Sequence, residues 1–152
     1  MTLPKLRREF DSLIPQIISI IMIVEIDNAP LTYISNSPIA GYGIFAEIPF
    51  ITGELILDYR PFMDTFYKIK WEDLNEYQTS HNWMIPINDE YCLTSDPVSK
   101  IHYFNHNRNP NCEWNIKEGI IKAARYIPLN EELTIDYRVE YRPNRKEFPS
   151  WI

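Results

Sequence analysis

Residues 103–112, YFNHNRNPNC, place a cluster of polar side chains directly after an apolar tyrosine–phenylalanine pair. A chain leaves a hydrophobic core at such a junction, so the polar residues can line a cleft. The amide of Asn105 can donate and accept hydrogen bonds to a small ligand, and His106 can do so through its side chain or its backbone. Taken alone, however, this stretch favours an Asn-Pro turn whose hydrogen bonds are satisfied locally.

A second informative stretch follows at residues 120–137, IIKAARYIPLNEELTIDY. Tyr137 ends an apolar segment, and a tyrosine that closes a strand is usually a half-buried packing residue. Glu131 and Glu132 stand beside a turn, where carboxylates are usually solvated. By itself, this stretch indicates no particular chemistry.

The third stretch, residues 41–59, reads GYGIFAEIPFITGELILDY. Gly41 and Gly43 flank Tyr42, and two glycines in a loop let the backbone approach a ligand closely. Taken alone, such a pair is more often explained by a tight turn. No glycine stands at Glu47 or Ile48, so the phosphate-binding pattern of a dinucleotide site is not expected here.

Short β-like segments separated by turn residues recur along the chain, and regular strand–helix alternation is missing. One helix is expected from Asp64 to about Gln78, because Tyr67, Trp71 and Leu74 fall on one face at helical spacing. The pattern therefore predicts a mainly β fold with one or two short helices. The expected strands are Leu31–Ile34, Gly43–Ala46, Leu55–Tyr59, Trp83–Ile87, Tyr91–Thr94, Gly119–Ala124 and Leu133–Tyr137.

Length and charge narrow the classes of function. A chain of 152 residues with 45% hydrophobic content is expected to form one domain with a single core. The formal net charge of −6 disfavours direct nucleic-acid binding and favours a cationic peptide partner. The two cysteines, Cys92 and Cys112, lack zinc-site spacing, so free thiols are expected.

The apolar run at residues 17–26 follows Lys5, Arg7 and Arg8, which superficially resembles a signal peptide. It lacks a small-residue cleavage site and is shorter than the ~20 apolar residues of a membrane span. We expect it to be a buried strand or helix, or else a contact in a homodimer.

Together, the three stretches resemble the opening, middle and closing motifs of the SET domain of protein lysine methyltransferases. The resemblance runs from about residue 30 to residue 138 and preserves the order of the motifs. It implies a SET-domain (β-clip) fold of several short twisted sheets with a threaded C-terminal segment. Residues 1–29 would then be an N-terminal flanking segment, residues 30–138 the SET domain and residues 139–152 a C-terminal tail.

The resemblance implies that S-adenosylmethionine is the cofactor and that no metal is required. Backbone around Gly41, Tyr42 and Gly43 would contact the methionine portion of the cofactor. Asn105 would bind the cofactor amine, and the backbone at His106 would read the adenine edge. The threaded arrangement would bring Tyr137 beside this segment.

Tyr137 matches the catalytic tyrosine of the family, and Tyr59 matches an aromatic position that lines the lysine channel. Ile135 stands at the channel position thought to limit how many methyl groups fit. An isoleucine cannot hold a water by hydrogen bonding, so multiple methylation is favoured. Tyr141, in a tail that lacks the family's zinc-binding cysteines, is expected either to close the channel with Phe148 and Trp151 or to lie in a loosely docked tail.

Two further positions depart from the family pattern. Asn107 replaces a serine, which changes the local hydrogen bonding. Asn130 replaces a glycine, and the turn should survive because asparagine tolerates positive φ. These departures leave open a catalytically silent SET-fold binding module, although the retained motif residues favour an enzyme.

The expected substrate is a basic protein or peptide, with a histone tail as the default and a ribosomal or other cytosolic protein as the alternative. An intracellular location is expected, and the compartment stays open because neither a nuclear basic cluster nor an export signal is evident. It would be the cytoplasm, the nucleus or a host cell into which the protein is delivered.

Overall fold

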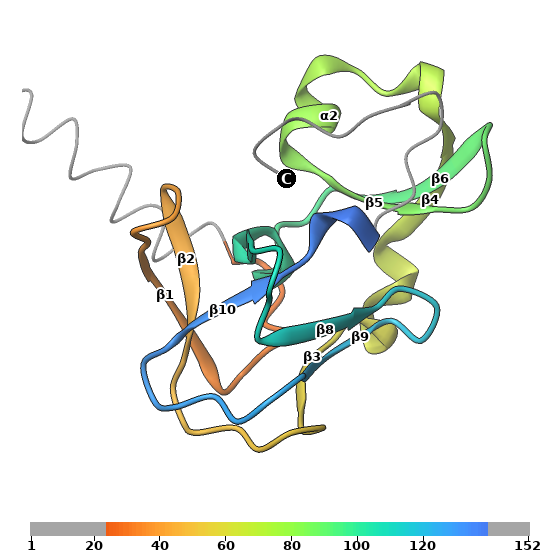
Figure 1. Ribbon diagram of the computed structural model, residues 1–152. Helices are drawn as coiled ribbons and strands as arrows, with labels where there is room; N and C mark the ends of the chain where they lie inside the picture. The colour runs from red at the N-terminus through yellow and green to blue at the C-terminus, as the bar shows by residue number, and fades with distance from the viewer. Residues whose placement is uncertain (1–23, 140–152) are drawn as a thin grey trace, which may run out of the picture.

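The computed structural model describes residues 24–139, which form three small β-sheets joined by turns and short helices (Figure 1). The first sheet has the order β1-β2-β10-β7, the second β3-β9-β8 and the third β4-β6-β5. The predicted mainly β fold is confirmed. The strands are β1 (Thr32–Asn36), β2 (Tyr42–Ala46), β3 (Leu55–Asp58), β4 (Phe66–Lys70), β5 (Trp83–Pro86), β6 (Tyr91–Ser95), β7 (Asn105–His106), β8 (Cys112–Asn115), β9 (Ile120–Ala123) and β10 (Glu132–Ile135).

Helices contribute little to the described part of the chain. The one α-helix among residues 24–139 is α2 (Glu76–His81). The 3-10 helices are η1 (Arg60–Thr65), η2 (Trp71–Asp73), η3 (Lys100–Tyr103) and η4 (Tyr137–Val139). In the same range, no helix is long and apolar enough to cross a membrane.

The predicted helix from Asp64 to Gln78 is wrong over most of its length. Residues 66–70 form β4, which pairs with β6 along its whole length. Its aromatic and β-branched residues suit a strand, and this pairing overrides the helical spacing of the apolar residues. The helix starts later, where Asn75 caps α2 and Gln78 completes a capping box with it.

The expected strands are all present, with ends shifted by one or two residues. Three strands were not predicted: β4, β7 and β8. The segment expected to end at Tyr137 stops as a strand at Ile135, and Tyr137 instead begins η4. The two-residue strand β7 lies in the asparagine-rich stretch, whose sequence indicates turns rather than strands, and β8 begins at the last residue of that stretch.

Strand β10 holds the first sheet together at the centre of the molecule (Figure 1). It pairs antiparallel with β2 and parallel with β7, so that Thr134 lies opposite Asn105 and Ile135 opposite His106. The residues after β10 are thereby brought next to the Asn105–His106 segment, as the resemblance implied.

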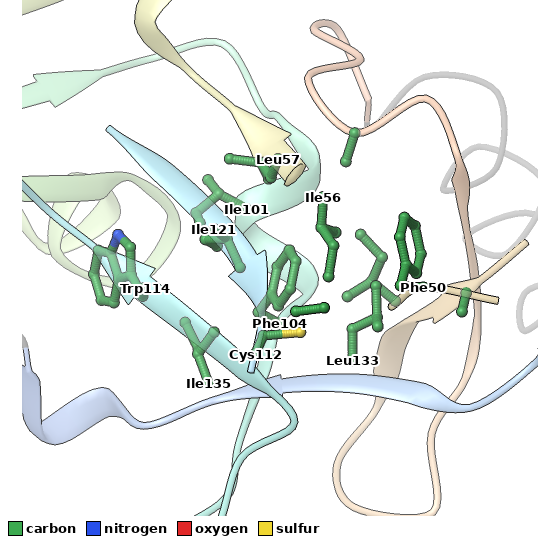
Figure 2. Close-up of a cluster of buried hydrophobic side chains, with 14 of the residues drawn as sticks. Phe50, Ile56, Leu57, Ile101, Phe104, Cys112, Trp114, Ile121, Leu133 and Ile135 are labelled. Carbon is green, nitrogen blue, oxygen red and sulfur yellow. The ribbon is translucent and has the colours of Figure 1, made fainter. Parts of the chain in front are cut away.

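A continuous hydrophobic core links the first two sheets. Figure 2 shows Ile56, Phe104, Cys112 and Leu133 gathered in this cluster, and each is at most 4% exposed. Burying a side chain of this kind contributes roughly 1.5–3 kcal/mol to the stability of the fold. Cys92 and Cys112 are both buried and free, which confirms the expected thiols.

The apolar run at residues 17–26 lies mostly outside the described residues. Its last residue, Ile26, forms a parallel bridge with Ser99, and the amides of Glu25 and Ile26 both donate to the carbonyl of Val98. Next to it, the buried ammonium of Lys100 donates to the carbonyls of Ala29 and Thr32, each at 2.9 Å. These contacts attach the N-terminal part of the described chain to η3.

Candidate functional site

The glycine loop at residues 41–43 leads from the turn after β1 into β2. Gly41 has φ +47°, a left-handed conformation that suits glycine, and the space where its side chain would lie is open. Gly43 is needed for another reason, because a Cβ at this position would overlap the carboxylate of Glu132. The backbone of Gly43 and the carboxylate of Glu132 are therefore in close contact at this loop.

The side chain of Asn105 connects this loop to β10. Its amide nitrogen lies 3.1 Å from the carbonyl oxygen of Ala40, 3.2 Å from that of Tyr42 and 3.3 Å from Oε1 of Glu132. The hydroxyl of Ser37 is a fourth acceptor at 3.1 Å. The local Asn-Pro turn favoured from the sequence does not account for Asn105, because its partners are distant along the chain.

This corner of the site holds more acceptors than donors. The amide of Asn105 has two hydrogens to share among four acceptors. Oε2 of Glu132 is buried and finds no hydrogen-bond partner among residues 24–139. A ligand carrying an ammonium group, with its positive charge and three N–H donors, fits this surplus. The cofactor implied by the sequence carries such a group.

His106 and Tyr137 form the second part of the site. Nδ1 of His106 accepts a hydrogen bond from the backbone N–H of Tyr137 at 3.1 Å, and the two rings lie 5.2 Å apart. Burial lowers the pKa of His106 below its usual 6.5, an effect that the nearby carboxylate of Asp136 opposes. The imidazole is therefore neutral at physiological pH, as an acceptor at Nδ1 requires.

The hydroxyl of Tyr137 donates to the carbonyl of Phe104 at 2.6 Å. Asp136 is paired with Arg138, whose hydrogen bonds lower the pKa of this carboxyl. Asp136 is thus held as a carboxylate beside His106, with Oδ1 3.8 Å from Nδ1. The catalytic candidate Tyr137 and the cofactor candidates Asn105 and His106 lie in one continuous site.

Ile135 is only 3% exposed and belongs to the hydrophobic core. Its carbonyl accepts from the amide of Asn107, which extends the pairing between β10 and the segment after β7. Asn130 has φ +67°, so the expectation that asparagine preserves this turn is confirmed.

Tyr59 follows β3 and is 3% exposed. Its hydroxyl donates to the carbonyl of Ile116 at 2.9 Å, its ring packs against that of Phe66, and Gly119 leaves room for it. Burial raises the pKa of Tyr59 to about 12, so the phenol is neutral near pH 7. Its position in a lysine channel stays a prediction. Tyr141 and the rest of the tail lie outside the described residues.

Sequence reasoning missed two contributors to the site. Glu132 was expected to be solvated, yet its carboxylate faces Asn105 and Gly43. Asn111 is 2% exposed and joins the strands, donating to the carbonyl of Glu132 at 2.7 Å and accepting from the amide of Thr134 at 2.9 Å. Gly43 was a sequence signal for a close contact of this kind, because a residue without a side chain leaves room for another group such as the carboxylate of Glu132.

Most of the site lies within a stretch of the chain that matches a known protein family. The family model described as the SET domain matches residues 41–138. Histone H3-lysine(4) N-trimethyltransferase ATX1 of Arabidopsis thaliana is 34% identical over 117 residues, covering 68% of this chain and 11% of that protein. Histone-lysine N-methyltransferase 2D of Homo sapiens is 29% identical over 128 residues, covering 77% of this chain and 2% of that protein. The chain therefore spans only a small part of the length of these relatives.

Proposed function

The chain belongs to the SET-domain family, and from this premise we propose that it is a protein-lysine N-methyltransferase that uses S-adenosylmethionine. One observation carries the proposal. Asn105 connects the glycine loop to β10, and the parallel pairing of β10 with β7 brings Tyr137 beside His106. Three motifs that lie far apart in the sequence thus form one site.

In this proposal, the acceptor-rich corner binds the ammonium end of the cofactor. The carbonyls of Ala40 and Tyr42 and the carboxylate of Glu132 accept its N–H groups, and Asn105 holds these acceptors in place. The backbone of His106 contacts the adenine edge. When bound, the cofactor supplies the electrophilic methyl group of a sulfonium.

Tyr137 is the proposed catalytic residue. Its hydroxyl proton is directed at the carbonyl of Phe104, and in the proposed role the phenolic oxygen holds an electron-poor methyl through weak C–H···O contacts. Methyl transfer is an in-line displacement, and such positioning keeps the attacking nitrogen, the methyl and the sulfur nearly collinear. The aromatic ring of Tyr59 would strip water from the lysine ammonium and so favour its neutral, nucleophilic form.

The proposed substrate is a lysine in a basic protein, with a histone tail first. The relatives are named histone-lysine methyltransferases, and the net charge of −6 favours association with a cationic peptide. The apolar side chain of Ile135 supports multiple methylation, which mass spectrometry of the product would measure.

The test is transfer of a labelled methyl group from S-adenosylmethionine to mixed histones and to a whole-cell protein extract. Label on a discrete band that is lost with Tyr137→Phe supports the proposal and identifies the substrate. Absence of label together with absence of cofactor binding by calorimetry would instead favour a catalytically silent binding module. A label confined to non-histone bands would retain the activity and reject the histone substrate.

A further inference from the structure

The imidazole of His106 is fixed in one orientation by a contact that a cofactor-binding backbone does not require. Nδ1 accepts the N–H of Tyr137, so the ring proton resides on Nε2. The side chain is 8% exposed. A buried ring whose tautomer is fixed by a hydrogen bond holds the group that it contacts, here the backbone of Tyr137, in a defined position.

Tyr137 is consequently held at two points. Its backbone N–H is bonded to the side chain of His106, and its hydroxyl is bonded to the backbone of Phe104, two residues earlier on the same segment. The register that pairs Ile135 with His106 aligns these two contacts. A shift of either contact would move the phenolic oxygen.

We infer that the side chain of His106 is a positioning residue that sets the location of the Tyr137 hydroxyl for methyl transfer, separately from any cofactor contact made by its backbone. This inference rests on the proposed function. It assigns the imidazole an effect on kcat with little effect on cofactor affinity. Misplacing a reacting or orienting group by about 1 Å can cost roughly a hundredfold in rate.

Protonation of the His106 imidazole should make its positioning of Tyr137 depend on pH. A protonated imidazole carries hydrogens on both nitrogens and cannot accept the N–H of Tyr137. The charged groups that act on it are Asp136, which favours the protonated form, and Arg108 and Arg138, which oppose it. Because burial further lowers the pKa of His106, we expect the contact to persist at neutral pH and to be lost in acid.

Three variants separate the roles. In His106→Asn the side-chain oxygen branches from Cγ as Nδ1 does, so it can accept the same N–H. His106→Gln has similar polarity but carries its acceptor one atom further out, near the Nε2 position, and His106→Phe keeps a ring without any acceptor. Circular dichroism and urea midpoints of all three establish that they fold. His106→Gln serves as the test should His106→Phe fail to fold.

With the substrate that the labelling experiment identifies, we expect kcat to fall roughly ten- to a hundredfold in His106→Phe and His106→Gln. Calorimetry should show unchanged affinity for S-adenosylmethionine. His106→Asn should recover most of kcat and lose the acid decline that the imidazole causes in the wild type. Equal kcat in the Asn and Gln variants, or a loss explained by cofactor affinity, would overturn the inference and leave the proposed function intact. A wild-type protein that transfers no methyl group would overturn both.

Discussion

The phenolic hydroxyl of Tyr137 donates a 2.6 Å hydrogen bond to the backbone carbonyl of Phe104, 33 positions earlier in the chain. Phe104 is 2% exposed and lies in the core, where Figure 2 shows it beside the other buried side chains. The tyrosine at the proposed reaction centre is thus bonded directly to the rigid interior of the fold. A catalytic group supported in this way keeps its position without help from the substrate.

Tyr137→Phe tests this contact directly. We expect the variant to fold and to bind S-adenosylmethionine as the wild type does, because losing one hydrogen bond to the Phe104 carbonyl costs about 1–3 kcal/mol, less than the stability of a typical domain. Methyl transfer should fall by roughly a hundredfold, as for other single preorganised polar groups. Labelled-methyl transfer and calorimetry measure the two effects. Full activity in Tyr137→Phe would remove this residue from the catalytic role.

Asn105→Ala should weaken cofactor binding. Removing the amide leaves the carbonyls of Ala40 and Tyr42 without the donor that now holds them together. Acceptors that are no longer held in place must be ordered when the cofactor binds, so we expect the affinity to fall by roughly tenfold. Calorimetry measures the affinity for S-adenosylmethionine, with Asn88→Ala in the β5–β6 turn as the matched control. Equal affinities in the two variants would contradict the placement of Asn105 at the ammonium.

Gly43→Ala should lower the free energy of unfolding by roughly 1–3 kcal/mol, because the new methyl group would overlap the carboxylate of Glu132. In a Glu132→Ala background the overlap is gone, so the added cost should be smaller. Gly41→Ala is the control: its strain comes from φ +47° and should not depend on residue 132. Urea denaturation of the single and double variants measures the coupling. Strict additivity of Gly43→Ala and Glu132→Ala would show that the two groups do not meet.

The sequence was informative where a residue type permits few alternatives. Asn130 was expected to keep a glycine-like turn, and its φ of +67° confirms this. The alternation of short apolar segments with turn residues likewise predicted the β architecture. Both inferences depend on local backbone preferences, which a single sequence carries.

What the sequence could not reveal was set by contacts between distant segments. Tyr67 has helical spacing relative to Trp71, yet it lies opposite Thr94 in a strand pair. Glu132 has the polarity of a surface residue, and only the close approach of Asn105 and Gly43 makes its carboxylate part of the site. Such pairings depend on which strands become neighbours, and periodicity along one segment does not record them.

Lys100 provides a prediction about stability remote from the chemistry. Its ammonium is bonded to the carbonyls of Ala29 and Thr32 and lies 3.0 Å from Oδ1 of Asp27. Lys100→Met would remove the donor that both carbonyls share, although the hydroxyl of Thr32 would still donate to Ala29, and we expect a loss of roughly 1–3 kcal/mol in the free energy of unfolding. Urea denaturation measures it against Lys117→Met, which removes an exposed lysine. Matching midpoints for the two variants would mean that Lys100 does not anchor the N-terminal segment.

The two thiols give a test of how closed the core is. Burial raises the pKa of Cys112 to about 12 and also raises the pKa of Cys92. The thiolate is the reactive form, so neither cysteine should react readily with a disulfide reagent at pH 8 in the folded protein, and both should react in urea.

The same pKa shift predicts the response of stability to alkali. The folded-state pKa of Cys112 lies above its usual 9.0, so as the pH rises from 9 towards about 12 the unfolded chain loses its proton first. Stability should therefore fall across that interval, and a Cys112→Ala variant should show less of the decline.

For the thiol-reactivity prediction, mass spectrometry of labelled peptides identifies which of the two cysteines reacts. Rapid labelling of Cys112 at pH 8 in the native protein would show that β8 opens locally, and would contradict a closed core around Phe104 and Leu133.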